Sequence, residues 1–435
     1  MNKYKRIINF LFNAVIIGVL AVGFSYVWFN YYSQSIFLPF YRRGNWMLIA
    51  IYVVITYLFF KIFECFKIGH LRRTDLIYSQ FIANIFVNIF MYAIICLIGR
   101  EWMDVMPMTL LTITDMFLLI IWTFCTNRIF QTIFSPRKLL IIYGNKNAEK
   151  LVSKMSARED KYIITNSISE YTDFDKIISE VKNYDGVILS ELSPQFENKI
   201  LKTLFSESVR TYISPKISDI ILRGAENIRL FDTPLLLCRN YGLTFEQRLS
   251  KRIFDILFSL FCIAILLIPM LIVGACIFIT DFGSPFYVQK RLTQDGKVFG
   301  CLKFRSMIKN AESKTGAILS EKDDPRITPI GKFIRKIRFD EVPQFFNILI
   351  GDMSVIGPRP ERPEIAAEYE KDMCEWSFRL KVKAGLSGYS QVVGLYDTTP
   401  YDKLRMDLIY IENYSFVLDL QILLMTIRTV LMRKG

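Results

Sequence analysis

Hydrophobic side chains form four long runs in the first 130 residues, at roughly 7–29, 46–66, 81–99 and 107–125. Each run is close to the ~20 residues that a helix needs to cross the hydrocarbon core of a bilayer. The first run has no small-residue cleavage site followed by a polar chain, so it is predicted to be retained and not removed as a signal peptide. The pattern predicts a membrane α-helical N-terminal bundle of four spans over residues 1–130.

Basic residues beside these runs predict their orientation. Most of the Lys and Arg residues fall on one side, at Lys3, Lys5, Arg6, Lys67, Arg72, Arg73, Arg128, Arg137 and Lys138. The other side has only Arg42, Arg43 and Arg100. Because short cytoplasmic flanks accumulate Lys and Arg, the N-terminus and the chain after residue 130 are expected in the cytoplasm.

Residues 139–238 follow a different pattern, in which short buried-strand segments alternate with helical ones. The strand segments are "KLLIIYG", "YIITNSI" and "GVILS", and "DFDKIISEVKNY" has a helical pattern. This alternation predicts a small α/β Rossmann-like cytoplasmic module with a parallel sheet. Gly144 ends the first strand, but residues 145–149 lack the other glycines of a G-x-G-x-x-G turn. A structural or regulatory module is therefore favoured over a working dinucleotide site.

A fifth apolar run, residues 253–279, is long enough to cross a membrane. Asp255 near one end and Pro269 near the middle argue against a simple span, since a proline removes a helical hydrogen bond and bends the axis. After four spans, a fifth crossing would place the basic residues beyond 281 outside the cell. A re-entrant helix broken at Pro269 keeps them cytoplasmic and is the favoured prediction, with a kinked complete span as the alternative.

Composition and charge limit which partners, metal sites and acid–base groups are expected. The net charge of +13 is concentrated beside membrane segments, so membrane lipids and phosphate-bearing substrates are expected partners, and no nucleic acid is. The eight cysteines form no C-x-x-C pair and five lie in apolar segments, which indicates packing and not disulfides or zinc. His70 is the sole histidine, so acid–base chemistry falls to carboxylates, Lys or Tyr.

An acidic doublet, Asp340–Glu341, stands in the segment "RFDEVPQFFN". One helical stripe precedes it, formed by Ile327, Ile330, Ile334 and Ile337. That helix is expected to end near Phe339, so that Asp340 caps the next helix with Pro343 in its first turn. At this positive helix end both carboxylates are expected to be ionised and to attract a divalent cation or phosphate. The alternative is an ordinary cap followed by a first-turn acid.

Short polar motifs crowd residues 281–415, and several place Gly or Pro beside Arg or Lys, which suits binding of phosphate oxygens. They are "GSPFYVQKR", "KFRSM", "DDPRITPIGKFIR", "GDMSVIGPRPE", "KAGLSGYSQVVG" and "DLIYIENYS". With the doublet, this ordered set closely resembles the bacterial sugar transferase family over residues 245–435. The four spans and the α/β module resemble the long form of its monotopic phosphoglycosyl transferases, the polyprenyl-phosphate hexose-1-phosphate transferases.

The resemblance implies a mostly α-helical catalytic domain, residues 245–435, with a re-entrant membrane helix. It implies transfer of hexose-1-phosphate from a UDP-sugar to undecaprenyl phosphate, which gives undecaprenyl-diphosphate-sugar and UMP. This is the first membrane step of exopolysaccharide, capsule or O-antigen synthesis. The enzyme is then expected in the bacterial cytoplasmic membrane, with its catalytic domain on the cytoplasmic face.

The resemblance also assigns residues. Asp340 matches the nucleophile that holds the sugar phosphate covalently, and Glu341 matches the second acid. The two carboxylates are expected to hold Mg²⁺, which offsets the charge on the attacking group and the diphosphate. Whether Glu341 steers the metal or accepts the lipid phosphate's proton is open.

The basic candidates follow the same correspondence. Arg335 and Arg359 match phosphate-binding arginines, with Lys303 and Arg305 as further substrate-binding candidates, although each could be a plain surface charge. Gln391, with Gly385 and Gly388, is expected to shape the nucleotide pocket, or else to form a simple turn.

Two other functions stay open. One is a non-enzymatic, membrane-anchored regulator or scaffold of polysaccharide assembly that senses a nucleotide through the α/β module. The other is a glycosyltransferase that transfers directly, with Asp340 only holding metal. The transferred hexose is open, because discrimination among hexoses depends on a few pocket hydrogen bonds. A homodimer is also open.

Overall fold

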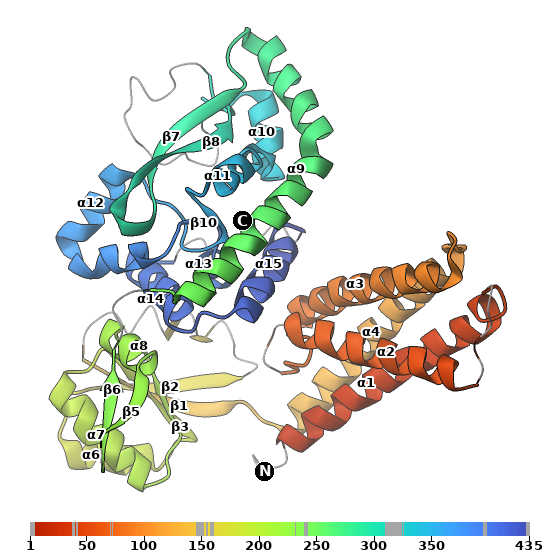
Figure 1. Ribbon diagram of the computed structural model, residues 1–435. Coiled ribbons are helices and arrows are strands. Elements are labelled where there is room, and N and C mark those ends of the chain that lie inside the picture. The colour runs from red at the N-terminus through yellow and green to blue at the C-terminus, as the bar shows by residue number, and fades with distance from the viewer. Residues whose placement is uncertain are drawn as a thin grey trace. The chain divides into compact units, whose positions relative to one another are not determined.

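The structure is a computed structural model in which two compact units divide the chain, Met1–Ser214 and Pro215–Gly435 (Figure 1). It describes residues 5–36, 40, 42–69, 71, 73–144, 152–153, 155–156, 161–230, 232–238, 242–308, 324, 326–394 and 398–431. The predicted turn at 145–149 and His70 lie outside these residues. All eight cysteines lie within them and are free thiols, as expected.

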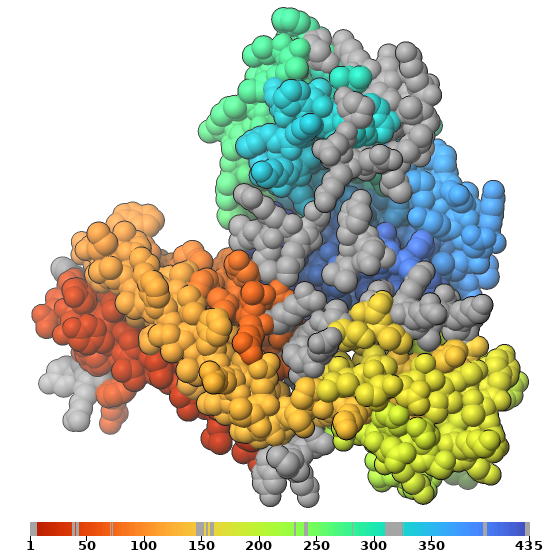
Figure 2. All heavy atoms as spheres, turned by 180° about the vertical axis from the view of Figure 1, so that it is seen from behind, coloured from red at the N-terminus to blue at the C-terminus, as the bar shows by residue number. Residues whose placement is uncertain are grey.

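The first unit begins with four long apolar helices. They are α1 (Lys5–Val27), which continues as a short π-helix to Tyr32, α2 (Arg42–Ile62), α3 (Arg73–Gly99) and α4 (Met106–Ile133). Each helix packs against the next and α1 also packs against α4, so the four form a bundle (Figure 1). Figure 2 shows the same helices, red to orange, with their side chains closely packed. Each is long and apolar enough to cross a membrane, which confirms the four predicted apolar helices.

The first unit ends in a four-stranded parallel sheet with the order β2-β1-β3-β4. Its strands are β1 (Arg137–Tyr143), β2 (Tyr162–Ser169), β3 (Gly186–Ser190) and β4 (Thr211–Ile213), with helices α6 (Phe174–Val181) and α7 (Pro194–Ser206). Leu139 and Leu140 point to opposite faces and both are fully buried, as in a sheet covered on both sides. The three predicted strands and their parallel arrangement are confirmed, and β4 is an addition.

The second unit combines helices with short strands. After α8 (Ile217–Arg223) and the hairpin β5 (Glu226–Leu230)–β6 (Thr233–Leu237) comes α9 (Phe245–Asp281). A second hairpin, β7 (Phe286–Leu292)–β8 (Val298–Phe304), precedes α10 (Pro329–Lys336), the 3₁₀ turn η3 (Phe339–Glu341) and α11 (Gln344–Ile350). The unit ends with β9 (Ser354–Ile356), α12 (Pro363–Asp372), η4 (Cys374–Lys381), β10 (Gly385–Ser387), α13 (Tyr389–Val393), α14 (Pro400–Glu412) and α15 (Phe416–Leu431). It is mostly helical, as predicted.

Helix α9 starts at a capping box, in which Thr244 and Gln247 each accept a hydrogen bond from the other's backbone N–H. The helix then runs for 37 residues and passes through Pro269 without interruption. The predicted break at Pro269 is therefore corrected to a bend, which Figure 1 shows in the second half of the green helix. A proline removes only one hydrogen bond, here to the carbonyl of Ile265, so the helix can continue on both sides.

Hydrogen bonds and an ion pair join the first turns of α9 to the rest of the second unit. Lys251 pairs with Asp419 of α15 at 2.6 Å. Arg252 donates two 2.6 Å hydrogen bonds to the last carbonyls of α11. One carboxylate oxygen of Asp255 accepts from the hydroxyl of Ser354 at 3.0 Å and from the amide of the next residue at 2.9 Å. Asp255 thus satisfies polar groups of β9, and this end of α9 belongs to the polar domain.

Candidate active site

The acidic doublet lies in its own 3₁₀ turn between α10 and α11. Arg338, just before it, has a left-handed backbone with φ of 55°. This conformation is uncommon for a residue with a side chain and marks local strain, which clusters at functional sites. It ends the α10 segment three residues earlier than expected and redirects the chain. The prediction that Asp340 caps the next helix is wrong, because Pro343 occupies that position in α11.

Aromatic packing fixes the doublet turn in place. Phe339 stacks on Phe304 of β8, with ring centroids 6.1 Å apart. Both rings belong to an apolar cluster with Ile334 of α10 and with Met270 and Ile277 of α9. The cluster forms because α10 places its isoleucine stripe inward. The doublet is therefore held against the part of α9 that follows Pro269.

Two cations hold the carboxylate of Glu341. The guanidinium of Arg359, in the turn after β9, donates to Oε1 at 3.1 Å, and Nζ of Lys303 on β8 lies 3.8 Å from the same oxygen. Burial opposes ionisation of Glu341, but Arg359, Lys303 and Arg338 outweigh it, so the pKa of Glu341 is lowered. Glu341 is thus an ionised anchor for two phosphate-binding candidates.

The carboxylate of Asp340 has a different environment. Burial raises the pKa of Asp340 and the negative charge of Glu341 adds to the effect, while Lys303 and Arg335 oppose it. Both carboxylates were expected to behave as ordinary ionised acids, but their surroundings push the two pKa values in opposite directions. Two neighbouring acids whose pKa values are shifted in opposite directions can take different roles in a reaction. Asp340 is the more basic member, and hence the better nucleophile.

The remaining basic candidates are Arg335 and Arg305. Arg335 on α10 donates to the hydroxyl of Ser306 at 2.7 Å and influences Asp340 electrostatically. Arg305 follows β8, and its amide donates to the carbonyl of Pro285 at 2.8 Å. The structure thus brings Lys303, Arg335 and Arg359 together with the doublet. For Arg305, a role in substrate binding stays a prediction.

Asn347 of α11 joins the doublet segment to β8. Its side chain accepts from the amide of Leu302 at 2.9 Å and donates to the carbonyl of Gly300 at 2.8 Å. These bonds fix the strand that carries Lys303 beside the turn that carries Glu341. Sequence reasoning gave Asn347 no role, although it stands within the doublet motif, six positions after Glu341.

Glycines shape the turn that presents Arg359. Strands β9 and β10 are parallel, and the chain just after β9 runs so close to the start of β10 that a Cβ on Gly357 would lie 2.4 Å from the carbonyl of Lys383. A Cβ on Gly388 would lie 2.2 Å from the carbonyl of Gly357. Gln391 is on α13 beside this crossing, and its buried Oε1 has no hydrogen-bond partner among the described residues. The described contacts do not join Gln391 to the doublet.

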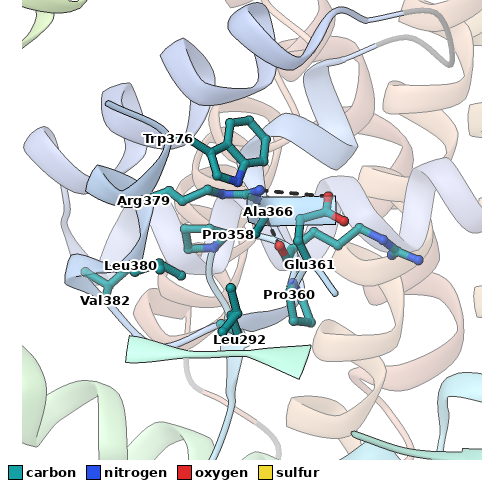
Figure 3. Close-up of a pocket in the computed structure, with 11 residues that line it drawn as sticks. Leu292, Pro358, Pro360, Glu361, Ala366, Trp376, Arg379, Leu380 and Val382 are labelled. Atoms are coloured by element: carbon teal, nitrogen blue, oxygen red, sulfur yellow. Dashed lines mark hydrogen bonds and ion pairs between the residues drawn. The ribbon is translucent and has the colours of Figure 1, made fainter. Parts of the chain in front are cut away.

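The buried side chain of Arg379 stabilises the turn that carries Arg359. Arg379 donates to the carbonyl of Arg359 at 2.9 Å, lies 2.7 Å from the carboxylate of Asp407 and covers the ring of Trp376. Figure 3 shows it reaching toward Glu361, 3.8 Å away. The cavity beside it has a volume of about 10 Å³, room for one water molecule and not for a nucleotide. Arg379 is therefore a support for Arg359, which sequence reasoning missed.

The donor set suits a Mg²⁺ ion that is completed by a substrate. Within the described residues no three acidic, histidine or cysteine side chains gather around one point. Mg²⁺ is commonly held by one or two carboxylates together with substrate phosphates, so Asp340 and Glu341 fit this requirement. With cations on one carboxylate and a more basic second carboxylate, the arrangement can bind a diphosphate and attack its phosphorus.

Sequence comparison with known proteins covers the region that holds this site. The family described as "Bacterial sugar transferase" matches residues 246–433. "Exopolysaccharide production protein ExoY" of Sinorhizobium fredii is 33% identical over 201 residues, 43% of this chain and 88% of its own length. The "Putative undecaprenyl-phosphate N-acetylgalactosaminyl 1-phosphate transferase" of Bacillus subtilis is 45% identical over 130 residues, 30% of this chain and 72% of its own length.

A longer relative extends the match. "UDP-galactose-lipid carrier transferase" of Erwinia amylovora is 34% identical over 258 residues, 55% of this chain and 53% of its own length. The chain therefore spans about half the length of the longer curated relatives. The family match, residues 246–433, holds the doublet together with Lys303, Arg335 and Arg359. The chain belongs to the bacterial sugar transferase family.

Proposed function

We propose that the chain transfers hexose-1-phosphate from a UDP-sugar to undecaprenyl phosphate and releases UMP. The observation that carries the proposal is the pair Asp340–Glu341, set among Lys303, Arg335 and Arg359 in the family region. A diphosphate needs such cations to offset its charge, and Arg suits it through bidentate hydrogen bonds. The names of the relatives, which include UDP-galactose and undecaprenyl phosphate, support the two substrates.

The reaction proceeds in two displacements. A carboxylate oxygen of Asp340 attacks the β-phosphorus of the UDP-sugar, the bond from that phosphorus to the bridging oxygen breaks, and UMP leaves. In the resulting acyl phosphate the Asp340 carboxylate is a good leaving group from phosphorus, so one difficult displacement becomes two easier ones. An oxygen of undecaprenyl phosphate then attacks the same phosphorus, which frees Asp340 and forms undecaprenyl-diphosphate-sugar.

The surrounding residues balance charge and position the reacting groups. Lys303 and Arg359 balance the charge of the diphosphate, and Glu341 keeps both cations in position. Asp340 and Glu341 would hold a Mg²⁺ ion, which would supply positive charge against the phosphate oxygens. Asn347 and Arg379 fix the strand and the turn that carry the two cations.

The contacts of α9 support a helix that returns to the side from which it enters. Its first turns bind the polar domain through Lys251 and Asp255, and its last half packs on the same domain through Met270 and Ile277. A helix of 37 residues is ~55 Å long, more than the ~30 Å hydrocarbon core requires. The bend at Pro269 lets both ends lie on the cytoplasmic face with the doublet.

The function is tested by UMP release from a panel of UDP-sugars, in vesicles that hold the full chain and undecaprenyl phosphate. We expect release with at least one UDP-sugar, dependence on the lipid phosphate for turnover and loss with EDTA. Release from none of the UDP-sugars would overturn the proposal. The panel also identifies the hexose.

Cysteine labelling tests the topology. Lys297 is exposed in the turn between β7 and β8, so a Lys297→Cys variant presents a new thiol there. In intact cells we expect no more labelling by a membrane-impermeant maleimide than in the unsubstituted chain, and additional labelling after lysis. Additional labelling in intact cells would place the domain outside and contradict the re-entrant helix.

Substitution of Gly357 by Ala tests the close backbone crossing. The new Cβ would lie 2.4 Å from one backbone atom of the Lys383–Gly385 segment and 2.9 Å from another, so the strand ends must separate and Arg359 must shift. We expect UMP release to fall by roughly 10-fold or more, since overpacking costs about 1–3 kcal/mol and displaces the cation. Gly274→Ala is the control, because its Cβ would meet nothing closer than 3.9 Å. Equal activity of the two variants would remove this role.

A further inference from the structure

Helix α9 buries polar side chains and exposes apolar ones. The buried face includes Asp255, which is 2% exposed, and Ser259, one turn further along, which is 0% exposed. The exposed face includes Leu257, Phe261 and Ile265, which are 58–63% exposed. Ionisable residues of a membrane helix usually face protein, while its apolar side chains face lipid. The contact of α9 with the rest of the second unit is therefore partly a set of hydrogen bonds, which have a defined geometry.

The hydrogen-bond partner of Asp255 is β9, the strand that leads to Arg359. On one side of β9 the amide of Ser354 donates to the carbonyl of Ala384, beside β10, at 2.8 Å. The amide of Val355 points to the other side, as successive amides of a strand do, and donates to Asp255 Oδ1 at 2.9 Å. The hydroxyl of Ser354 donates to the same oxygen at 3.0 Å. Asp255 thus occupies the edge of β9 that β10 leaves free.

The β9–β10 pair is too small to fix its own position. Each strand has three residues, and among the described strands no third one joins this sheet. A two-stranded sheet is marginally stable unless it packs against another element. The residues of β9 are 0–1% exposed, so the elements around the strand determine where it lies. Helix α9 is one of these elements, and Asp255 supplies its hydrogen bonds to the strand.

A second contact joins α9 to the other end of β9. Lys251 Nζ lies 2.6 Å from the carboxylate of Asp419 and 3.1 Å from the hydroxyl of Tyr410. This hydroxyl donates to Asp419 Oδ1 at 2.7 Å and lies 3.5 Å from the carbonyl of Ile356, the last residue of β9. The first turns of α9 are therefore connected to both ends of the strand.

Only Gly357 and Pro358 separate β9 from Arg359. Proline has a fixed φ, and Gly357 lies in the close crossing with the Lys383–Gly385 segment, so this link has little freedom to absorb a displacement of the strand. The guanidinium of Arg359 donates to Glu341 at 3.1 Å. A displacement of β9 would therefore move Arg359 relative to the acidic doublet.

We propose that Asp255 is a positioning residue. By holding β9 on the membrane helix α9, it sets the place of the Arg359 guanidinium and thereby the affinity of the site for a diphosphate. The inference rests on the part of the proposed function in which Arg359 binds the diphosphate of the substrate. It adds that α9, besides its place in the membrane, controls the geometry of substrate binding.

The test is a double-mutant cycle in which calorimetry measures the Kd of UDP, with Mg²⁺ present, for the full chain in lipid nanodiscs. Asp255→Leu, which removes the acceptor oxygen, is expected to weaken UDP binding at least ~10-fold, because Arg359 is displaced. If Asp255 acts through Arg359, the double variant with Arg359→Met should bind UDP within ~2-fold of Arg359→Met alone, since coupled effects are not additive. Effects that multiply would show that Asp255 acts independently of Arg359, and would overturn the proposal.

Three further variants complete the cycle. Asp255→Asn keeps an oxygen that can accept both hydrogen bonds, so its Kd should lie within ~3-fold of the unsubstituted chain. Ser259→Ala is the matched control and should leave the Kd unchanged, because Ser259 is equally buried on α9 but its hydroxyl has no hydrogen-bond partner among the described residues. If Asp255→Leu does not fold, Ser354→Ala replaces it in the cycle and should weaken binding ~3-fold or more, since one hydrogen bond is lost. An unchanged Kd in the variant used contradicts the proposal.

Failure of this inference differs from failure of the proposed function. Coupled effects on UDP binding, in a chain that releases no UMP from any UDP-sugar, would support the role of Asp255 and contradict the transfer reaction. UMP release together with multiplying effects on UDP binding would support the transfer reaction and contradict the role of Asp255. An unsubstituted chain that binds no UDP also overturns that role.

Discussion

An Asp340→Asn variant is expected to release UMP at least about 10³-fold more slowly than the unsubstituted chain, with its fold intact. The amide has nearly the shape of the carboxylate, but it is a very poor nucleophile and cannot form the acyl phosphate. Loss of a covalent nucleophile removes most of an enzyme's rate, so the effect should be among the largest of any single substitution. UMP release in vesicles at saturating UDP-sugar measures it.

The matched control is Asp372→Asn, at the exposed end of α12. This variant removes one negative charge from the same domain and should retain full activity. If Asp340→Asn kept more than a few per cent of the rate while its thermal midpoint was unchanged, Asp340 could not be the nucleophile.

Replacement of Arg379 by Met is expected to give the largest loss of stability, about 3–5 kcal/mol in the free energy of unfolding of the second unit. The substitution leaves the carboxylate of Asp407, which lies 2.7 Å from the guanidinium, buried without its counter-charge. It also frees the turn of Arg359, because Arg379 donates to that backbone carbonyl. Unfolding followed by tryptophan fluorescence measures the loss, since Trp376 lies under Arg379.

The loss should depend on pH in a defined direction. Burial raises the pKa of Asp407 above its ordinary value, and Arg379 opposes that rise. Without Arg379 the folded-state pKa rises further, so the buried charge destabilises the variant above that pKa and is removed by protonation below it. The deficit of Arg379→Met should therefore shrink as the pH falls from 8 toward 5. A constant deficit would show that lost packing is the cause.

A second substitution separates stability from activity. In the double variant Arg379→Met with Asp407→Asn, no buried charge remains, so much of the stability should return. The hydrogen bond to the Arg359 carbonyl stays absent, so UMP release should remain low. Lys371→Met, an exposed basic residue of α12, controls for the loss of a positive charge. Recovery of activity together with stability would limit Arg379 to a structural role.

The elements that sequence patterns predicted well are those with a local hydrophobic signal. The four apolar runs became α1 to α4, and the three strand segments became β1, β2 and β3 in a parallel sheet. Lys303, Arg335 and Arg359 do lie beside the doublet, although 56 positions separate the first of them from the last. The order of their motifs predicted that these three residues act at one site, which composition alone could not have predicted.

The features that sequence patterns missed depend on tertiary contacts. No local sequence signal predicts the left-handed backbone of Arg338. This conformation accompanies the packing of the next residue, Phe339, on Phe304. Pro269 was expected to end a helix, but the loss of a single hydrogen bond only bends α9. Asn84 and Asn88 stand four residues apart inside an apolar run and are both buried in the bundle, but their neighbours on other helices cannot be placed from sequence alone.

The measurement that tests the proposed chemistry most directly is mass spectrometry of the chain after brief incubation with its UDP-sugar and Mg²⁺, without lipid acceptor. We predict one UMP released per chain, and a sugar-phosphate mass on Asp340 in the tryptic peptide that begins at Phe339. Addition of undecaprenyl phosphate should remove that mass. If no UMP appears before the lipid is added and no adduct forms on Asp340, transfer is direct and the covalent mechanism is contradicted.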